Sequence, residues 1–305
     1  MDRVLSIAIV IPVYKRECVF SLVAYLCRQT YPYRLYFIIV DNGNDKCLSS
    51  RLRRLAAPNC NVIRFERNRG GAGAYHAGMS AAVEGGFDFT WLLDDDALID
   101  ELTLPNLVDE YKNLQGRNVR VGALGSMVVD LGTPDRVIEV GSTISHFTGR
   151  ICPRHAKELL SRMGLQTEEV DYTPAVSLLV QREVLVRAGF FSEVFIHWDD
   201  VEWQFRLKRL GYRNFATTKS RVRHVRSNGK RAEWLWYYDN RNPVWFLLRH
   251  RIYIVPFSII FRMARALLTL LKGERQAARL MALGVWHAVT GEVLLRDELP
   301  VEHRD

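Results

Sequence analysis

The chain has 305 residues, of which 48% are hydrophobic and 25% are charged, so it can bury a large core. This composition excludes a disordered or fibrous protein and fits one elaborated α/β domain or a domain with an appendage. The formal net charge of +8 predicts an anionic partner: a nucleotide, a nucleic acid or an anionic membrane surface.

The cysteines form an odd set without a CxxC pair, which favours reduced thiols that fill the core of a cytosolic protein. They are Cys18, Cys27, Cys47, Cys60 and Cys152. The first residues lead straight into strand-like sequence without the layout of a signal peptide, so we expect no secretion. We also expect no transmembrane helix, because no uninterrupted apolar span reaches the required length.

The first third of the chain alternates strand-like and helix-like segments. Buried strands are predicted at 7–13, 36–40, 61–65 and 89–93, and helices at 18–29, 48–56 and in the segment that leads to residue 83. Such an alternation predicts right-handed βαβ units and an open, mostly parallel sheet. Ligands of these sheets bind beyond the carboxyl ends of the strands.

Polar residues stand at three of these strand ends, at 12–15, 41–42 and 94–96. The last group is the acidic triplet Asp94, Asp95 and Asp96. Side chains alternate along a strand, so Asp94 and Asp96 are expected to share one side while Asp95 points away. Two carboxylates at a strand end can hold Mg²⁺ or Mn²⁺ and leave positions for diphosphate oxygens. The alternative interpretation is a solvated acidic turn.

A glycine-rich loop at 68–74 opens the third predicted helix. It follows the third strand, misses the third glycine of the dinucleotide fingerprint and lacks the Gly-Lys-Ser/Thr of a P-loop, which argues against a nicotinamide cofactor. One interpretation is that the glycines only allow positive φ angles and close approach of the backbone to other groups. The other is that the loop also directs the N-terminus of the helix toward a nucleotide.

The middle of the chain is less regular. Short strands in mixed or antiparallel pairing are predicted within 121–145, followed by a polar excursion at 149–172 near the acceptor. The segment 173–180 returns to the core, and a helix at 182–188 ends at Gly189.

A second acidic cluster begins the next helix, where Asp199, Asp200 and Glu202 stand beside Trp198 and Trp203. Helix capping accounts for one of the carboxylates. Another could take a proton from an attacking hydroxyl near a metal-diphosphate site, and the flanking tryptophans could provide faces for a sugar ring. Farther along, His224 follows a strand-like segment and is either structural or completes the metal shell.

The C-terminal part, from residue 243, mixes apolar stretches with cations and Pro256. This pattern predicts helices that lie in a membrane interface, with packing on the catalytic domain or on a second subunit as the alternative. We therefore divide the chain into a catalytic domain at 1–242 and a helical, membrane-associating region at 243–305.

Taken together, these motifs resemble the inverting family 2 glycosyltransferases of the GT-A fold. The matching segments cover roughly residues 6–230 and stand in family order: 11–14, 40–43, 68–73, 94–96, 198–200 and His224. The acidic triplet, the Trp-Asp-Asp motif and the glycine-rich loop are similar to those of bacterial galactofuranosyltransferases, and the pattern at 237–242 occurs in that branch and in related rhamnosyltransferases. Family members often carry Glu-Asp at positions 199–200, and the Gln-x-x-Arg-Trp motif of processive synthases is absent here.

The resemblance implies a role for each matching residue. Pro12, Tyr14 and Asp41 would line the uridine pocket, with Asp41 bonded to the base, and Asn68 and Asp95 would also contact the donor. The resemblance gives the metal and the ribose-diphosphate to Asp94 and Asp96, with His224 as a further metal ligand. It makes Asp200 the general base and places Trp198 and Asp199 at the sugar or acceptor.

The implied reaction is metal-dependent transfer of galactofuranose from UDP-galactofuranose to a hydroxyl of a bacterial surface glycan, in lipopolysaccharide or O-antigen biosynthesis, with Mn²⁺ or Mg²⁺. Alternatives are a rhamnosyltransferase that uses dTDP-rhamnose, a nucleotidyltransferase and a non-catalytic membrane scaffold. The expected partners are the nucleotide sugar, a glycan or lipid-linked acceptor and a membrane surface, and no nucleic acid. The expected location is the cytoplasmic face of the bacterial inner membrane, and a homo-oligomer is left open.

Overall fold

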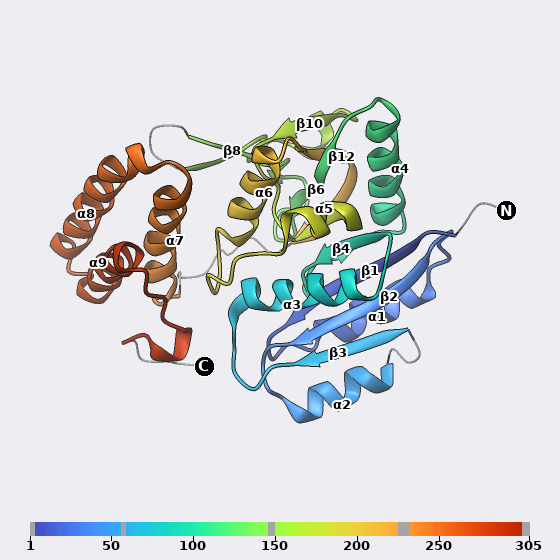
Figure 1. Cartoon of the computed structure of the whole chain (residues 1–305), viewed down its shortest axis with the longest axis horizontal. Helices are drawn as coiled ribbons and strands as arrows, with labels where there is room; N and C mark the ends of the chain where they lie inside the picture. The colour runs from blue at the N-terminus through green and yellow to red at the C-terminus, as the bar shows by residue number, and fades with distance from the viewer. Residues whose placement is uncertain (1–3, 56–58, 146–149, 225–231, 301–305) are drawn as a thin grey trace.

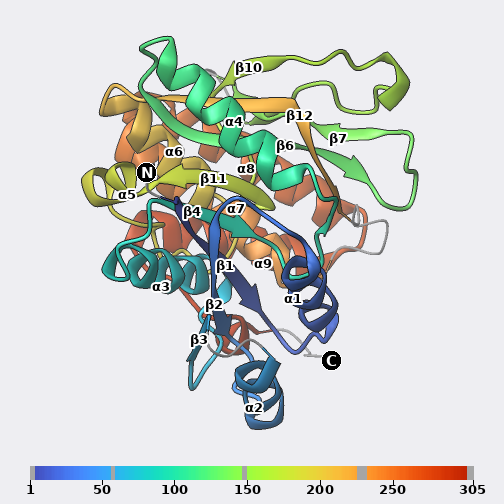
Figure 2. The same cartoon turned by 90° about the vertical axis from the view of Figure 1, so that its right-hand side faces the viewer.

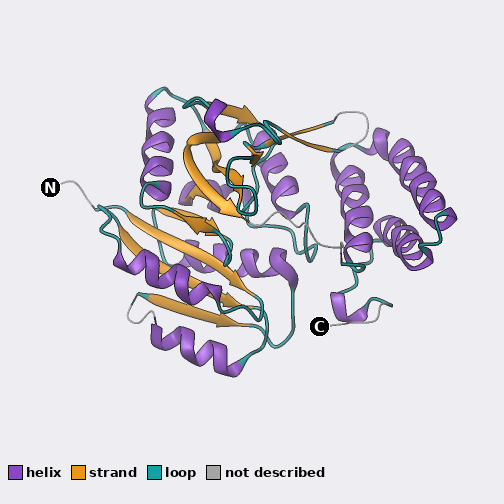
Figure 3. Ribbon diagram, turned by 180° about the vertical axis from the view of Figure 1, so that it is seen from behind, coloured by secondary structure: helices purple, strands orange, loops and turns teal. Residues whose placement is uncertain are grey.

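A computed structural model describes residues 4–55, 59–145, 150–224 and 232–300. A central sheet carries helices on both faces, and three C-terminal helices stand beside it (Figure 1; Figure 3). The strand order along the sheet is β10-β12-β6-β11-β4-β1-β2-β3, with β5 paired to β12 and β7 to β6. The structure is therefore α/β, as the sequence predicts.

The first half of the sheet is parallel, and its predicted strands are confirmed. These strands are β1 (Ser6–Val13), β2 (Arg34–Asp41), β3 (Cys60–Arg64) and β4 (Phe89–Leu93). Their β-branched and aromatic side chains suit a sheet covered on both faces, and β4 is buried along its whole length. Each large apolar side chain buried in this way contributes about 1.5–3 kcal/mol.

Helices cover the two faces of the sheet with separate apolar cores. One face packs α1 (Cys18–Arg28), α2 (Lys46–Leu55) and α4 (Thr103–Gly116). The other packs α3 (Gly70–Glu84), α5 (Arg182–Ala188) and α6 (Asp199–Arg209). Figure 2 shows α4 lying along β6 and β12. Sequence analysis did not predict α4, although its buried Leu104, Leu107, Val108 and Tyr111 have helical spacing.

The second half of the sheet is mixed, as expected for the segment after residue 121. Its strands are β5 (Leu98–Ile99), β6 (Val121–Asp130), β7 (Val137–Glu139), β10 (Thr167–Val170), β11 (Ser177–Gln181) and β12 (Arg213–His224). Because β11 runs antiparallel to both β4 and β6, the C-terminal end of β4 meets the start of β11.

The polar excursion predicted at 149–172 is more ordered than its composition indicates. It contains β9 (Ile151–Pro153), which pairs with β8 (Ser142–Ile144), the 3₁₀ turn η1 (Leu160–Arg162), and β10, which pairs with β12 at one edge of the main sheet. The polar residues of β10 suit an edge strand, because within the described ranges one of its sides has no neighbouring strand.

The C-terminal helices are α7 (Leu235–His250), α8 (Val255–Leu271) and α9 (Arg275–Thr290), with the 3₁₀ turns η2 (Ile252–Ile254) and η3 (Arg296–Glu298). The boundary placed after residue 242 lies inside α7. The expectation that no apolar span is long enough to cross a membrane is wrong by length and composition: the 20 helical residues Ile252–Leu271 meet that criterion. Pro256 does not interrupt them because it lies in the first turn of α8, where a missing N–H is tolerated.

The cysteines do not fill the core. Cys60 is partly exposed, and Cys18, Cys27, Cys47 and Cys152 are exposed. All are free thiols, as predicted, but their burial was predicted wrongly.

The contact between α7 and α9 requires a glycine. An added Cβ at Gly284 would lie 2.4 Å from the carbonyl oxygen of Tyr237. We expect Gly284→Ala to lower the free energy of unfolding by about 1–3 kcal/mol, because the backbones must separate. Urea denaturation measures the change. Gly116→Ala is the control, because no atom lies within 4 Å of its added Cβ; equal losses in the two variants would contradict this account.

Candidate active site

The acidic triplet lies in a turn that directly follows β4. The backbone N–H of Asp94 donates to the carbonyl of Val176 at 3.2 Å, and the N–H of Ala97 donates to the carbonyl of Asp94 at 3.2 Å. The side chains are therefore directed by this turn, which is tied to the segment before β11, and not by strand alternation. Asp94 and Asp96 nevertheless come together on one side, as expected.

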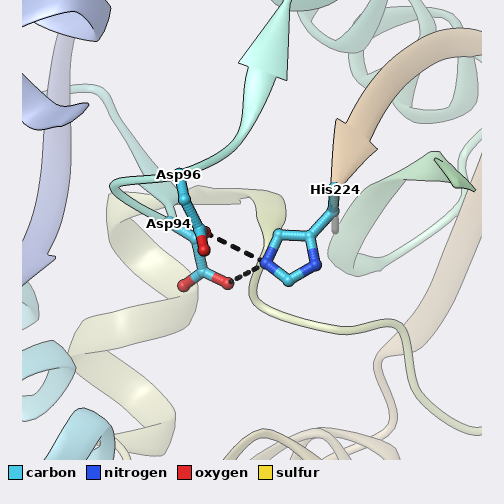
Figure 4. Close-up of side chains that lie close together, drawn as sticks. All are labelled: Asp94, Asp96 and His224. Atoms are coloured by element: carbon cyan, nitrogen blue, oxygen red, sulfur yellow. Dashed lines mark ion pairs between the residues drawn. The ribbon is translucent and has the colours of Figure 1, made fainter. Parts of the chain in front are cut away.

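The end of β12 brings His224 to these two carboxylates. Its Nε2 lies 3.0 Å from Oδ1 of Asp96 and 3.7 Å from Oδ2 of Asp94 (Figure 4). One ligand atom from each of these three side chains lies within 4.8 Å of the ligand atoms of the other two. Two carboxylate oxygens and one imidazole nitrogen are donors that suit Mn²⁺ or Mg²⁺, so the side chains predicted as metal ligands fit a divalent cation.

The electrostatics of this group favour a positive charge among the carboxylates. Burial lowers the pKa of His224, but its hydrogen bond to Asp96 and the charges of both aspartates outweigh burial and raise it. Burial likewise opposes ionisation of Asp96, but His224 and Arg16 outweigh it and lower that pKa. The pKa of Asp94 is raised, chiefly by burial.

Asp95 has a different environment from its neighbours. Its Oδ1 lies 3.4 Å from the Arg16 guanidinium, and its buried Oδ2 has no hydrogen-bond partner among the residues that the structure describes. Burial raises the pKa of Asp95 to about 7. This carboxylate is therefore close to half protonated at neutral pH and is outside the group that fits a metal.

The second acidic cluster begins α6. Phe195, His197 and Trp198 all have positive φ, between 62° and 74°, so the chain turns sharply before the helix. Such backbone is uncommon for bulky residues and clusters at functional sites. It directs Asp199 and Asp200 toward the acidic triplet, and both clusters line one cleft of about 700 Å³.

Asp200 is held at the N-terminus of α6. Its Oδ1 accepts the Val201 N–H at 2.8 Å, and its Oδ2 accepts the Ala175 N–H at 3.4 Å. Burial and the charge of Asp199 raise the pKa of Asp200 well above the ordinary value for a carboxyl. Burial also raises the pKa of Asp199, to about 6. A carboxylate with a raised pKa can accept a proton more readily than an ordinary aspartate.

Two other members of this cluster do not reach the cleft. Glu202 is buried against Arg206 and His250, each 3.0 Å from its Oε1. Trp203 lies in the core and donates from Nε1 to the carbonyl of Gly189 at 2.8 Å. The interpretation of Trp203 as a face for sugar is therefore wrong, whereas Trp198 does line the cleft.

Of the four residues predicted on the nucleotide side, two line the cleft and two do not. Pro12 and Tyr14 line the cleft, but Asp41 and Asn68 are not among its described lining residues. The fully buried Asp41 accepts from the Ser49 hydroxyl and, at 3.0 Å, from the Gly43 N–H. Asn68 accepts from Nδ2 of Asn42 at 2.9 Å. Asn42, rather than these two residues, lies at the wall of the cleft.

Several residues of the cleft were not singled out from the sequence. The Tyr75 hydroxyl donates to Oδ1 of Asp94 at 2.6 Å, and Arg16 pairs with Asp96. His197 and Asp239 form a pair at 2.6 Å at the α7 side of the cleft. Tyr75 follows the glycine-rich loop by one residue, which is the only local signal; the other contacts depend on tertiary structure.

The α/β fold and the acidic cleft at its strand ends are accompanied by a partial match to a known family. Residues 8–125 match the family described as Glycosyl transferase family 2. This segment is similar to family 2 glycosyltransferases, and the fold of the chain is the GT-A fold.

Relatives in sequence include galactofuranosyltransferases of mycobacteria. The chain is 28% identical over 190 residues to galactofuranosyltransferase GlfT1 of Mycobacterium tuberculosis, which is 58% of this chain and 56% of that protein. It is 27% identical over 183 residues to GlfT1 of Mycolicibacterium smegmatis, with the same two shares. The match thus spans a little over half the length of these relatives.

Solved structures share the fold at low identity. GalNAc-T7, crystallised with UDP, GalNAc and Mn²⁺, superposes with a TM-score of 0.63 at 12% identity, over 94% of this chain and 56% of that one. The mannosyltransferase PcManGT of Pyrobaculum calidifontis, in complex with GDP-Man and Mn²⁺, gives 0.55 at 15% identity, over 97% and 78%. S. aureus TarS gives 0.55 at 16% identity, over 93% and 81%.

Proposed function

We propose that the protein transfers galactofuranose from UDP-galactofuranose to a hydroxyl of a bacterial surface glycan, with inversion at the anomeric carbon. The observation that carries this proposal is the meeting of two acidic clusters in one cleft. One cluster suits the diphosphate end of a nucleotide sugar, and the other suits an acceptor hydroxyl. The choice of galactofuranose is supported by the 28% identity to the GlfT1 proteins.

Asp94, Asp96 and His224 would hold a divalent cation. A cation held there would neutralise the charge that develops on the departing UDP. Tyr75 keeps Asp94 in place through its hydroxyl, and the backbone turn after β4 holds both carboxylates. Pro12, Tyr14 and Asn42 would form the wall on the nucleotide side.

Asp200 would act as the general base. It accepts the proton of the acceptor hydroxyl as the oxygen attacks the anomeric carbon, and the bond from that carbon to the UDP oxygen breaks on the opposite face. The N–H groups of Val201 and Ala175 fix the orientation of the carboxylate. Trp198 provides an apolar wall beside the reacting sugar, and Asp199 raises the basicity of Asp200.

A donor panel tests the proposal. UDP-galactofuranose, UDP-galactopyranose and dTDP-rhamnose are offered with an oligosaccharide acceptor, and products are analysed by mass spectrometry and NMR. We expect turnover with UDP-galactofuranose and a β-linked product. Turnover with dTDP-rhamnose alone would instead support the rhamnosyltransferase, which shares the pattern at 237–242.

Metal binding in the presence of UDP should become tighter as the pH rises. The pKa of His224 is raised by its aspartate neighbours, so its imidazole is protonated below that pKa and must lose the proton to bind a cation. Asp96, with its lowered pKa, is already ionised in this range. We expect Mn²⁺ affinity to rise by at most about tenfold per pH unit, for one released proton.

Isothermal titration of Mn²⁺ across a pH series measures this slope. His224→Ala should weaken binding and flatten the slope. The matched control is His155→Ala, because His155 pairs with Glu158 and Glu168 outside the cleft. An unchanged slope in His224→Ala would show that another group releases the proton.

A further inference from the structure

Helix α8 exposes most of its large apolar side chains, whereas an ordinary surface helix buries them. The buried side of α8 carries Val255, Ser258, Arg262 and Ala266. We call these exposed apolar residues the outer face of α8: Phe257, Ile260, Phe261, Met263, Leu267, Leu268, Leu270 and Leu271. Phe257 is 69% exposed and Leu271 is 74% exposed. An exposed apolar face of this size indicates a surface that binds another protein or a membrane.

The polar side of α8 is fixed to α7. The Arg262 guanidinium donates to the carbonyl of Asp239 at 2.8 Å and to Oδ1 of Asn240 at 3.3 Å, and its Nε donates to Ser258 at 3.3 Å. Burial lowers the pKa of Arg262 to about 10. Because a buried guanidinium needs these acceptors, α8 cannot turn its polar side away from α7 without leaving them unpaired.

These contacts favour a helix that lies on a bilayer over one that crosses it. A crossing helix is surrounded by lipid or by other crossing helices, and α8 is bound along one side to α7 and α9. These neighbours connect α8 to the cleft: α7 contributes Asp239 to it, and α9 packs on α7 (Figure 1). Of α8 itself, the outer face is the side that these contacts leave open to lipid.

Charge identifies the kind of surface. Between residues 265 and 279, four cations, Arg265, Lys272, Arg275 and Arg279, accompany a single carboxylate, Glu274. All five side chains are exposed. Arg265 and Lys272 are seven residues apart, so they lie along one edge of the outer face. Basic residues at the edge of an apolar helix face suit lipid headgroups with negative charge.

We propose that the outer face of α8 docks the protein on an anionic lipid bilayer, with the helix axis parallel to the membrane plane. The docked helix holds the α7 side of the cleft, where Asp239 pairs with His197, close to the membrane. Access to a lipid-linked acceptor rests on the proposed function, whereas the docking itself does not.

Sedimentation of the full chain with phospholipid vesicles, without donor or acceptor, tests the docking. We expect binding to vesicles that contain phosphatidylglycerol and weaker binding to pure phosphatidylcholine. The triple variant Phe257→Gln, Leu267→Gln, Leu271→Gln should lose at least about tenfold in vesicle partition, because three exposed anchors no longer enter the lipid. Thermal melting checks that it remains folded.

A matched triple variant supplies the control. Leu102, Leu165 and Val186 are 56%, 80% and 57% exposed on other elements, and their change to Gln should leave the partition within about twofold. The proposal is overturned if the wild-type chain does not sediment with anionic vesicles, or if the two triple variants bind alike. It is also overturned if the chain is a dimer that only the α8 variant splits, because the outer face would then cover a second copy. None of these outcomes depends on which sugar is transferred.

Discussion

Replacing Asp200 by asparagine is expected to lower the turnover number by about 10²–10⁴-fold while leaving the affinity for UDP and Mn²⁺ unchanged. The single amide oxygen can still accept the Val201 N–H, which Oδ1 accepts at 2.8 Å, so the helix start is preserved; the longer contact of Oδ2 with the Ala175 N–H, at 3.4 Å, is lost. What is lost is the capacity to take the proton of the acceptor hydroxyl. Initial rates of transfer and titration of UDP with Mn²⁺ measure the two effects separately.

The pH dependence of transfer gives Asp200 a second, independent readout. A base acts only when it is deprotonated, so the rate should fall as the pH falls through the raised pKa of Asp200. Asp199→Asn removes a negative neighbour that raises this pKa, and the acidic limb should therefore move to lower pH. Normal turnover in Asp200→Asn, or an acidic limb that does not move in Asp199→Asn, would remove Asp200 from the role of base.

Replacing Asp96 by asparagine should weaken Mn²⁺ binding in the presence of UDP by more than about 100-fold. Loss of residues that merely support metal ligands already costs about 10–100-fold in affinity, and Asp96 is expected to be a ligand itself. Its carboxylate also pairs with His224 and Arg16, so the variant removes a negative charge that both of these side chains face. Calorimetric titration of Mn²⁺ measures the loss.

Asp95→Asn is the matched control within the same turn. The pKa of Asp95 is about 7, so its neutral form is already well populated at neutral pH, and an amide of the same shape imitates that form. We expect Mn²⁺ affinity to stay within about tenfold of wild type. If Asp95→Asn were as damaging as Asp96→Asn, the assignment of the cation to Asp94, Asp96 and His224 would be wrong.

Local patterns predicted most elements of the first half of the sheet. The runs that form β1 and β4 are apolar except for Ser6 and Thr90, as expected for strands covered on both faces, and α5 begins and ends where its sequence indicates. The same approach missed α4 and described β10 as part of a polar excursion. An edge strand buries little of its surface, so its sequence carries a weak pattern.

The candidate site divides in a similar way. Asp94, Asp96, Asp200 and His224 follow from motifs and from their places at the ends of elements. Trp203 stands in the same motif as Trp198 but turns into the core, because Trp198 precedes α6 and Trp203 lies five residues farther along, on another side of the helix. The buried Asp41 supports its loop through Ser49 rather than lining the cleft.

By itself, the sequence determined the α/β class, identified the acidic residues of the candidate site and showed the basic, apolar character of the C-terminal region. These features can be read from composition and from the spacing of residues that are close together in the chain. Only the tertiary structure decided that His224 reaches the acidic triplet, that Asp200 shares its cleft, and that α8 exposes its apolar side. Each of these depends on strand order or on packing between distant segments. Arg262 is an example: this charged residue can lie on the buried side of α8 because α7 supplies acceptors for its guanidinium.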